Sequence, residues 1–235
     1  MEISKGIEII DLALWIRDER VLAIADLGIG AEKAAGSGFV PRLNYTEITS
    51  RLEEKIFRNL EESPELIIIN GAIKRESGAS STQENQEAAA IIEFLKRKCP
   101  RIVLVKGSND AVLKSVADKQ NILFEDYHLL DSDVLFIHGD KEPEEALVKK
   151  AKTIIIGQQN PSMSAKDGDK EGCKCFMRGK YKKKELIVMP SMNSVTTGND
   201  LLGGEVLSPL IKEIGKFEVF AVKDKIQYLG EIGDL

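Results

Sequence analysis

The sequence predicts an α/β fold, a four-layer α/β/β/α sandwich of two mixed sheets, and two observations carry this prediction. The first is a set of five short apolar runs that each end in glycine with polar residues beside it, which is typical of strands buried on both faces. The runs are Val21–Gly30, Leu66–Gly71, Ile102–Gly107, Val134–Gly139 and Ile154–Gly157. The second is that helical patterns alternate with these runs in the first half, whereas the second half resembles a meander. In open α/β sheets, sites gather at the carboxyl ends of such strands, so one pocket is expected there.

The first half begins with a sheet edge. Residues 1–20 alternate apolar and polar side chains, which predicts an edge hairpin leading into strand 21–25. Residues 31–41 are expected to be loop. A helix follows, because apolar residues recur every four positions on one face, at Ile48, Leu52, Ile56 and Leu60, and Ser63-Pro64 ends it.

The next unit repeats the alternation of strand and helix. Strand 65–70 is followed by a polar loop at 74–81, and Ser81-x-x-Glu84 forms a capping box that opens a helix. Pro100 ends this helix. Its inward face is predicted to consist of Ala88, Ile91, Ile92 and Leu95.

The second half changes character after a short helix, strand 133–137, a charged helix at 142–150 and strand 153–156. Further strands are expected at 172–178, 185–190, 217–222 and 226–229, with turns at Gly179-Lys180 and Lys223-Asp224. The chain contains no internal repeat, low-complexity tract or linker. We therefore expect residues 1–235 to form a single domain.

Composition excludes several functional classes. The chain has 235 residues, 43% of them hydrophobic and 30% charged, as in a soluble globular protein. Its net charge of −5 argues against broad, non-specific nucleic-acid binding, although a local basic patch stays open. There is no apolar stretch of the ~18–20 residues that a membrane span needs, and no signal peptide at the N-terminus. The expected location is cytoplasmic, without membrane contact.

The three cysteines, Cys99, Cys173 and Cys175, include no Cys-x-x-Cys pair. Cys173 and Cys175 alternate along a predicted strand and so point to one face. A zinc site would need two further ligands near them, and none is present. They are interpreted as small buried apolar residues.

The strand ends carry a recognisable series of motifs. In order they are Ala25-Asp-Leu-Gly28, Gly71-Ala72, Gly107-Ser-Asn-Asp110, His138-Gly139 and Gly157-Gln-Gln-Asn160. In order and spacing this series resembles the signature of the metallophosphoesterases, or calcineurin-like phosphoesterases. Two further segments, Asn70–Arg75 and Met189–Asn193 with Gly198 and Asp200 after it, resemble the small prokaryotic branch called DNA-ligase-associated or ICC-like phosphoesterases. The resemblance extends over nearly all of the chain.

The resemblance implies a centre of two divalent metals, but most of its ligand positions are substituted. Those positions fall on Asp26, Gly28, Ala72, Ser108, His138, Gln158 and Asn160. Only Asp26 and His138 keep the family residue. Ala72 stands in place of the metal-bridging aspartate and Asn109 in place of the general-acid histidine. Because two metals ~3.5–4 Å apart depend on shared ligands, we expect no two-metal hydrolysis, no catalytic residue and no cofactor.

The pocket residues leave two interpretations open. The pocket is expected to contain Asp26, Gly28, Ala72, Ser108, Asn109, Asp110, His138, Gln158 and Asn160. One interpretation is a pocket repacked for stability, in which the hydroxyl and amide side chains satisfy one another. The other is a pocket re-used for a small ligand such as a nucleotide or phosphate, assisted by backbone N–H groups of Gly28, Gly30, Gly107 and Gly157.

The leading hypothesis is a degenerate metallophosphoesterase-like protein that serves as a binding or structural subunit. By analogy with family relatives, its partner would be a protein, such as a nucleic-acid-processing enzyme. The alternative is a metal-dependent phosphoesterase, acting on phosphodiesters or phosphomonoesters with a single metal. That ion, manganese or another divalent metal, would be held by Asp26, His138 and the amides of Gln158 and Asn160.

A lysine-rich turn and a single histidine are interpreted as ordinary surface features. Lysines at hairpin turns are usually solvated tips, but Lys180, Lys182, Lys183 and Lys184, with Tyr181 among them, could make weak nucleic-acid contacts. His128 is interpreted as a surface or internally satisfied histidine rather than a ligand.

Overall fold

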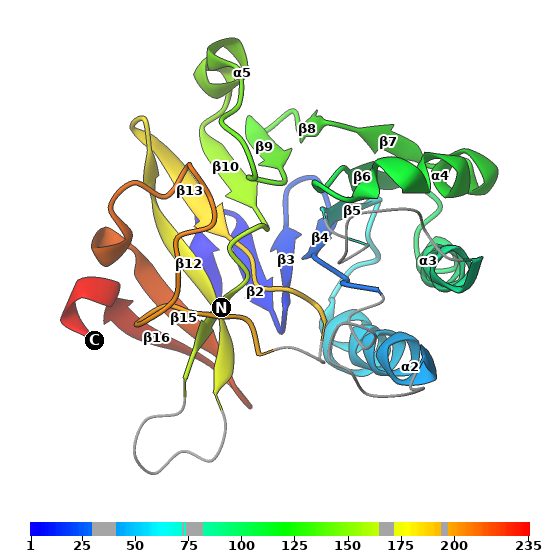
Figure 1. Cartoon of the computed structure of the whole chain (residues 1–235), viewed down its shortest axis with the longest axis horizontal. Coiled ribbons are helices and arrows are strands. Elements are labelled where there is room, and N and C mark those ends of the chain that lie inside the picture. Colours follow the sequence, from blue (N-terminus) through cyan, green and yellow to red (C-terminus); the bar gives the residue numbers. More distant parts are fainter. Residues whose placement is uncertain (30–40, 72, 74–81, 165–171, 194–196) are drawn as a thin grey trace.

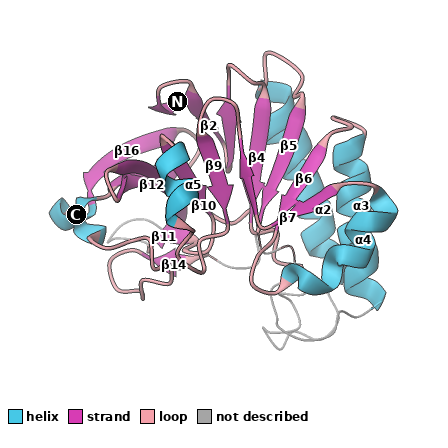
Figure 2. Ribbon diagram, turned by 90° about the horizontal axis from the view of Figure 1, so that it is seen from above, coloured by secondary structure: helices cyan, strands magenta, loops and turns pink. Residues whose placement is uncertain are grey.

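The computed structural model describes residues 1–29, 41–71, 73, 82–164, 172–193 and 197–235. Gly30, Ala72, the cap residue Ser81 and the predicted loops at 31–40 and 74–81 lie outside these residues. Two mixed sheets pack against each other, as the sequence predicts (Figure 1, Figure 2). The single-domain organisation stays a prediction.

The first sheet has seven strands in sequential order. They are β1 (Glu2–Ser4), β2 (Ile7–Ile10), β3 (Ala13–Ile16), β4 (Val21–Ala25), β5 (Leu66–Asn70), β6 (Ile102–Val105) and β7 (Leu123–Glu125). Strands β1 to β4 pair antiparallel, and β4 to β7 pair parallel. The alternating residues 1–20 therefore supply three strands, one more than the expected hairpin.

Helices cover the outer side of this sheet (Figure 2). They are α2 (Pro41–Arg51), which continues through a π turn (Leu52–Ile56) and a 3-10 turn (Phe57–Asn59), then α3 (Thr82–Lys96) and α4 (Lys114–Gln120) after a 3-10 turn (Asp110–Leu113). Pro41 begins α2 because its missing N–H has no partner in a first helical turn anyway. The predicted inward residues of α2 and α3 are buried, except that Leu60 is only half-buried.

The second sheet has nine strands, with β14-β11-β12-β13-β10-β9-β8 in line, β15 paired to β12 and β16 paired to β15. Their bounds are β8 (Tyr127–Leu129), β9 (Val134–Ile137), β10 (Thr153–Ile156), β11 (Pro161–Met163), β12 (Cys173–Tyr181), β13 (Lys184–Val188), β14 (Asn199–Asp200), β15 (Glu218–Val222) and β16 (Ile226–Glu231). Strands β7, β8, β11 and β14 were not predicted, because two or three residues carry no readable periodicity.

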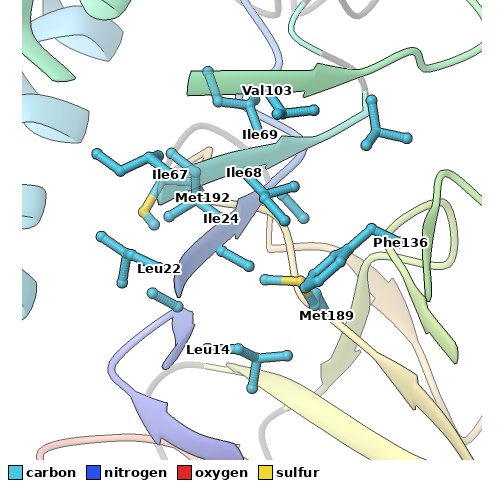
Figure 3. Close-up of a cluster of buried hydrophobic side chains, with 14 of the residues drawn as sticks. Leu14, Leu22, Ile24, Ile67, Ile68, Ile69, Val103, Phe136, Met189 and Met192 are labelled. Atoms are coloured by element: carbon cyan, nitrogen blue, oxygen red, sulfur yellow. The ribbon is translucent and has the colours of Figure 1, made fainter. Parts of the chain in front are cut away.

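Strand alternation builds the core between the sheets. Phe136, Ile155, Phe176 and Ile187 face the first sheet, and their strand neighbours face the opposite way, into a second apolar cluster. Figure 3 shows Phe136 and Met189 packed beside Ile24 and Ile68 of the first sheet. Cys175 belongs to the second cluster and Cys173 packs against it, so both lie on one face as the alternation predicts.

The outer side of the second sheet carries less helix than expected. Its one α-helix among the described residues is α5 (Glu145–Lys150), whose Val148 joins the second cluster. The predicted start at residue 142 was wrong, because Pro143 lacks a backbone donor and disfavours the helical conformation of the residue before it. Leu201, Leu210, Ile211 and Phe217, from the irregular segment before β15, cover the rest of this face.

The predicted turn at Gly179-Lys180 was also wrong. These residues lie inside β12, and the chain reverses at Lys182-Lys183, between the paired residues Tyr181 and Lys184. Gly179 is there for packing, since a Cβ atom would stand 2.6 Å from the ring of Phe217. The turn after Val222, at residues 223–225, agrees with the prediction.

Candidate functional site

Asp26 lies where the two sheets meet. It follows β4 directly, is buried, and has a φ of +47°, a left-handed conformation that aspartate tolerates better than most residues. Gly157, which follows β10, lies against its carboxylate: a Cβ atom at position 157 would stand 3.0 Å from Asp26 Oδ2. Glycine at the end of β10 therefore leaves room for the carboxylate.

His138 follows β9 and faces Asp26. Its Nε2 lies 3.5 Å from Asp26 Oδ1, and its Nδ1 lies 3.4 Å from Asp140 Oδ1. The side chain is only 3% exposed. Gly71, at the end of β5 with φ +82°, makes this position possible, because a Cβ atom there would overlap the imidazole ring. The imidazole is thus enclosed by one glycine and two carboxylates.

The two carboxylates decide the charge of His138. Burial acts to lower its pKa, but the hydrogen bond to Asp140, the close contact with Asp26 and the negative charges of both carboxylates outweigh burial and raise the pKa from 6.5 to about 9. Asp140 responds in the opposite direction: His138 lowers the pKa of the Asp140 carboxyl. In this arrangement His138 is an imidazolium at neutral pH.

This pKa predicts how stability depends on pH. The folded-state pKa lies above the unfolded value, so the stabilisation by His138 is complete below pH 6.5 and is lost as the pH rises through about 9. The shift corresponds to at most about 3 kcal/mol. Urea unfolding of wild type and His138→Gln should differ by ~2–3 kcal/mol less at about pH 10 than at about pH 6. Equal differences at both pH values would contradict this ion-pair arrangement.

Lys174 supplies the matched control for that measurement. Burial, and then the positive charge of Arg51, lower its pKa from 10.5 to about 7, while Asp26 acts to raise it. Its destabilising contribution is therefore complete below pH 7 and is relieved as the pH rises to 10.5. The difference between wild type and Lys174→Met should consequently change with pH in the opposite direction to that of His138→Gln.

A loop after β13 closes the site. Ser191 Oγ donates to the Asp26 carbonyl at 2.5 Å, and Asn193 Nδ2 donates to the Gly28 carbonyl at 2.9 Å. Lys174, on the inner face of β12, donates from Nζ to the carbonyls of Ser191, at 2.8 Å, and Asn193. Gly28, with φ +60°, cannot be replaced without conflict, because a Cβ atom there would overlap Asn193. The lysine and the loop thus hold the Asp26–Gly28 segment.

The other predicted site residues are used in different ways. Asn160 Oδ1 accepts from Ser191 N at 2.9 Å, and Asp110 Oδ2 accepts from Gly107 N at 2.8 Å and Ile73 N at 3.3 Å. Ser108 is exposed, and Asn109 and Gln158 are half-buried. Ala72 lies outside the described residues.

Three buried polar atoms at this edge make no hydrogen bond to the described residues. They are Asp26 Oδ1, Asn70 Oδ1 and His138 Nε2. Asn70 pairs in register with Ala25, the residue before Asp26, so its amide belongs to the same edge. An unsatisfied buried group costs ~1–3 kcal/mol, which a water or a single ion with two to four polar partners would offset.

The donor set does not fit the two divalent metals that the sequence resemblance implies. A two-metal centre needs shared anionic ligands, and Ala72, at the bridging position, has no donor atom. The Asn160 oxygen is already bound to Ser191 N. Among the described residues, no group of three or more His, Cys, Asp or Glu side chains is placed to hold a metal.

A groove of about 480 Å³ opens outside His138. Ser108 and Tyr127 line it together with His138. Its charged lining consists of the carboxylates Asp126, Asp140, Glu142 and Glu144 and the lysines Lys106 and Lys141. With the His138 imidazolium, four carboxylates stand against three cations, an excess of negative charge that disfavours an anionic phosphodiester.

Sequence reasoning missed several residues that shape the site. Asp140 was detectable, because it follows the His138-Gly139 pair directly. The alternation along the strand places Lys174 on the face opposite to Cys173 and Cys175, but it does not tell which face is inward. The clamp from Ser191 and Asn193 joins segments 165 residues apart and has no local signal.

Comparison with known proteins establishes the class of fold. No family model matches the chain, and a comparison with curated proteins found no match. The chain is similar in structure to the Pseudomonas putida nuclease MPE, with a TM-score of 0.63 and 16% sequence identity, over 94% of this chain and 93% of that one. The chain thus shares its fold, an α/β arrangement with two packed mixed sheets, with that nuclease. None of the described helices is long and apolar enough to cross a membrane.

Proposed function

We propose that this chain is a degenerate metallophosphoesterase-like protein that does not carry out two-metal hydrolysis and serves as a binding or structural subunit. The observation that supports the proposal is that most of the metal-ligand positions implied by the resemblance are substituted. Of the seven, one carboxylate and one imidazole remain, Asp26 and His138, and these face each other at 3.5 Å. The negative charge of Asp26, which divalent ions would otherwise neutralise, is neutralised by the protonated His138.

The charge of the groove supports the same proposal. A phosphodiester approaching His138 would meet the carboxylates of Asp140 and Glu142. Like charges disfavour association by several kcal/mol when they are brought together at an interface. A binding role therefore fits this groove better for a neutral or cationic group than for a phosphate.

A single-ion site is the second candidate, because Asp26 Oδ1, Asn70 Oδ1 and His138 Nε2 are all buried without a hydrogen bond to the described residues. Asp26, Asn70 and His138 would hold that ion, with His138 deprotonated. Asn70 replaces Asn160 of the sequence-based alternative, because the Asn160 side chain is already engaged. Such a site would supply Lewis-acid chemistry to a phosphoester.

The partner remains part of the proposal. The solved structure to which the chain is similar is a nuclease by its title, which supports a role in nucleic-acid processing. The protein partner and the cytoplasmic location rest on the sequence interpretation alone.

The test of the proposal combines the metal content of the purified protein with manganese-dependent hydrolysis of a phosphodiester. We expect no dinuclear centre and no hydrolysis above that of Asp26→Ala.

A further inference from the structure

A second and larger groove lies away from His138, around the turn between β12 and β13. Its volume is about 850 Å³, and its walls come from this hairpin, residues 212–218 and Glu231. Its lysines are Lys180, Lys182, Lys183, Lys212 and Lys216. Lys184 is not among them, because its Nζ donates to the carbonyls of Lys149 and Ala151 at the end of α5. Of the lysines predicted at the basic turn, Lys184 therefore does not line the groove. Lys212 and Lys216, from a distant segment, do line it.

Most of the carboxylates in this groove are already engaged. Glu218 pairs with Arg178 at 2.7 Å, and Glu213 pairs with Lys216 at 2.7 Å. Glu185 accepts from the hydroxyls of Ser4 and Thr153. Lys180 and Lys183 form no ion pair with any residue of the described ranges, so the hairpin presents uncompensated positive charge.

Tyr181 lines the groove, and its hydroxyl is buried beneath the surface. The residue is 1% exposed, and its hydroxyl makes no hydrogen bond to the residues that the structure describes. Lys182 Nζ lies 5.1 Å from the centre of its ring. A buried hydroxyl without a partner is destabilising unless a ligand or water completes it.

The Glu142 carboxylate shows that lysines of this groove bind an anionic oxygen group. Its carboxylate lies 2.8 Å from Lys212 Nζ and 3.7 Å from Lys182 Nζ, so it bridges the two segments. Lys212 first, and then the Tyr181 hydroxyl, lower the pKa of Glu142, although that hydroxyl lies outside hydrogen-bond geometry. The two ammonium groups thus each face one oxygen of a carboxylate that the chain itself supplies.

The turn keeps its lysines in an unfavourable backbone conformation. Lys182 and Lys183 have φ values of +46° and +66°, in a two-residue hairpin loop of the kind that favours Asn-Gly. Side chains other than Asn, Asp and Gly are strained there. Such strain at a ligand-facing turn motivates a functional hypothesis.

We propose that this groove binds a phosphate group of a phosphorylated ligand. The Tyr181 hydroxyl and the ammonium groups of Lys182 and Lys212 contact the phosphate oxygens after the Glu142 carboxylate has moved away. A dianionic phosphate suits the site better than a carboxylate, because Lys180 and Lys183 add charge that Glu142 does not balance. The proposal is independent of the chemistry at Asp26 and His138.

The test measures binding of three probes: pyrophosphate, a single-stranded oligonucleotide with a 5′-phosphate, and the same oligonucleotide without it. Wild type should bind the phosphorylated probes, with affinity falling as salt rises. Binding of pyrophosphate would identify a small phosphorylated molecule as sufficient, and binding of only the 5′-phosphorylated strand would identify a nucleic-acid end. No salt-sensitive binding of either phosphorylated probe would overturn the proposal.

The decisive variant is Lys182→Asn with Lys183→Gly. It relieves the strained turn, so the melting temperature should stay equal or rise, while affinity should fall ~10-fold or more. Tyr181→Phe should also keep or raise the melting temperature and weaken binding ~5-fold, because it removes one hydrogen-bond donor. Glu142→Gln should tighten binding several-fold, since it removes the internal competitor. Unchanged affinity in the turn variant, with the fold intact, would overturn the proposal.

Discussion

Restoring five family residues should convert this protein into a manganese-dependent phosphodiesterase at least ~100-fold more active than wild type, which is the scale of a positioned general acid alone. The substitutions are Ala72→Asp, Ser108→Asn, Asn109→His, Gln158→His and Asn160→His. Together with Asp26 and His138 they supply two carboxylates, one amide and three imidazoles at metal positions, and one further imidazole as general acid. Hydrolysis of a chromogenic phosphodiester with and without Mn²⁺ measures the gain.

Gly28→His is left out of this variant for a structural reason. Gly28 has φ +60°, and a Cβ atom there would overlap Asn193. A second variant should therefore combine it with Asn193→Ala. Asp26→Ala in the restored background is the control and should abolish the gain. A restored variant that binds two metals but stays inactive, or a wild type that is equally active, would contradict the interpretation of these positions.

Gly71→Ala should destabilise the protein by ~2–6 kcal/mol. A left-handed residue other than glycine is strained by ~1–3 kcal/mol, and forcing a methyl group into a packed site costs another ~1–3 kcal/mol. Here the methyl group would overlap the His138 ring. Urea unfolding of the variant measures the loss.

A double variant separates the two contributions. Combining Gly71→Ala with His138→Ala removes the overlap but keeps the backbone strain, so the two changes should be less destabilising together than their sum, by ~1–3 kcal/mol. Gly203→Ala is the matched control, because Gly203 has open space where its Cβ would lie. Strictly additive effects of the first two substitutions would argue against contact between residue 71 and the imidazole.

The two-sheet fold was predictable because its main signals are local. Three of the five apolar runs that end in glycine form β4, β5 and β6 of the first sheet, and the other two form β9 and β10 of the second. Helices with apolar residues every three or four positions define the helical layer of the first sheet. What sequence could not supply was the short strands β7, β8, β11 and β14, because two or three residues carry no readable periodicity. The turn at Lys182-Lys183 was misplaced because Gly179 looked like a turn signal, whereas it makes room for Phe217.

The sequence predicts which residues lie in the site, but not the hydrogen bonds that connect them. The order of motifs indicates that Asp26 and His138 lie in one pocket, and the structure brings Asp26 Oδ1 and His138 Nε2 to 3.5 Å. That Asn160 binds Ser191, and that Lys174 holds the loop after β13, depends on side-chain directions that a sequence does not contain. Ala72, the substitution with the largest chemical consequence, is readable from sequence alone.

The most direct test of this account is the number of metal ions per chain, measured by elemental analysis of protein saturated with Mn²⁺ and then desalted. Bringing two divalent cations to within ~4 Å costs several kcal/mol even at an effective dielectric of ~20, and Ala72 offers nothing to offset it. The account predicts that wild type retains no dinuclear centre and matches Asp26→Ala in phosphodiester hydrolysis. About two metal ions per chain, with hydrolysis that Asp26→Ala abolishes, would contradict it.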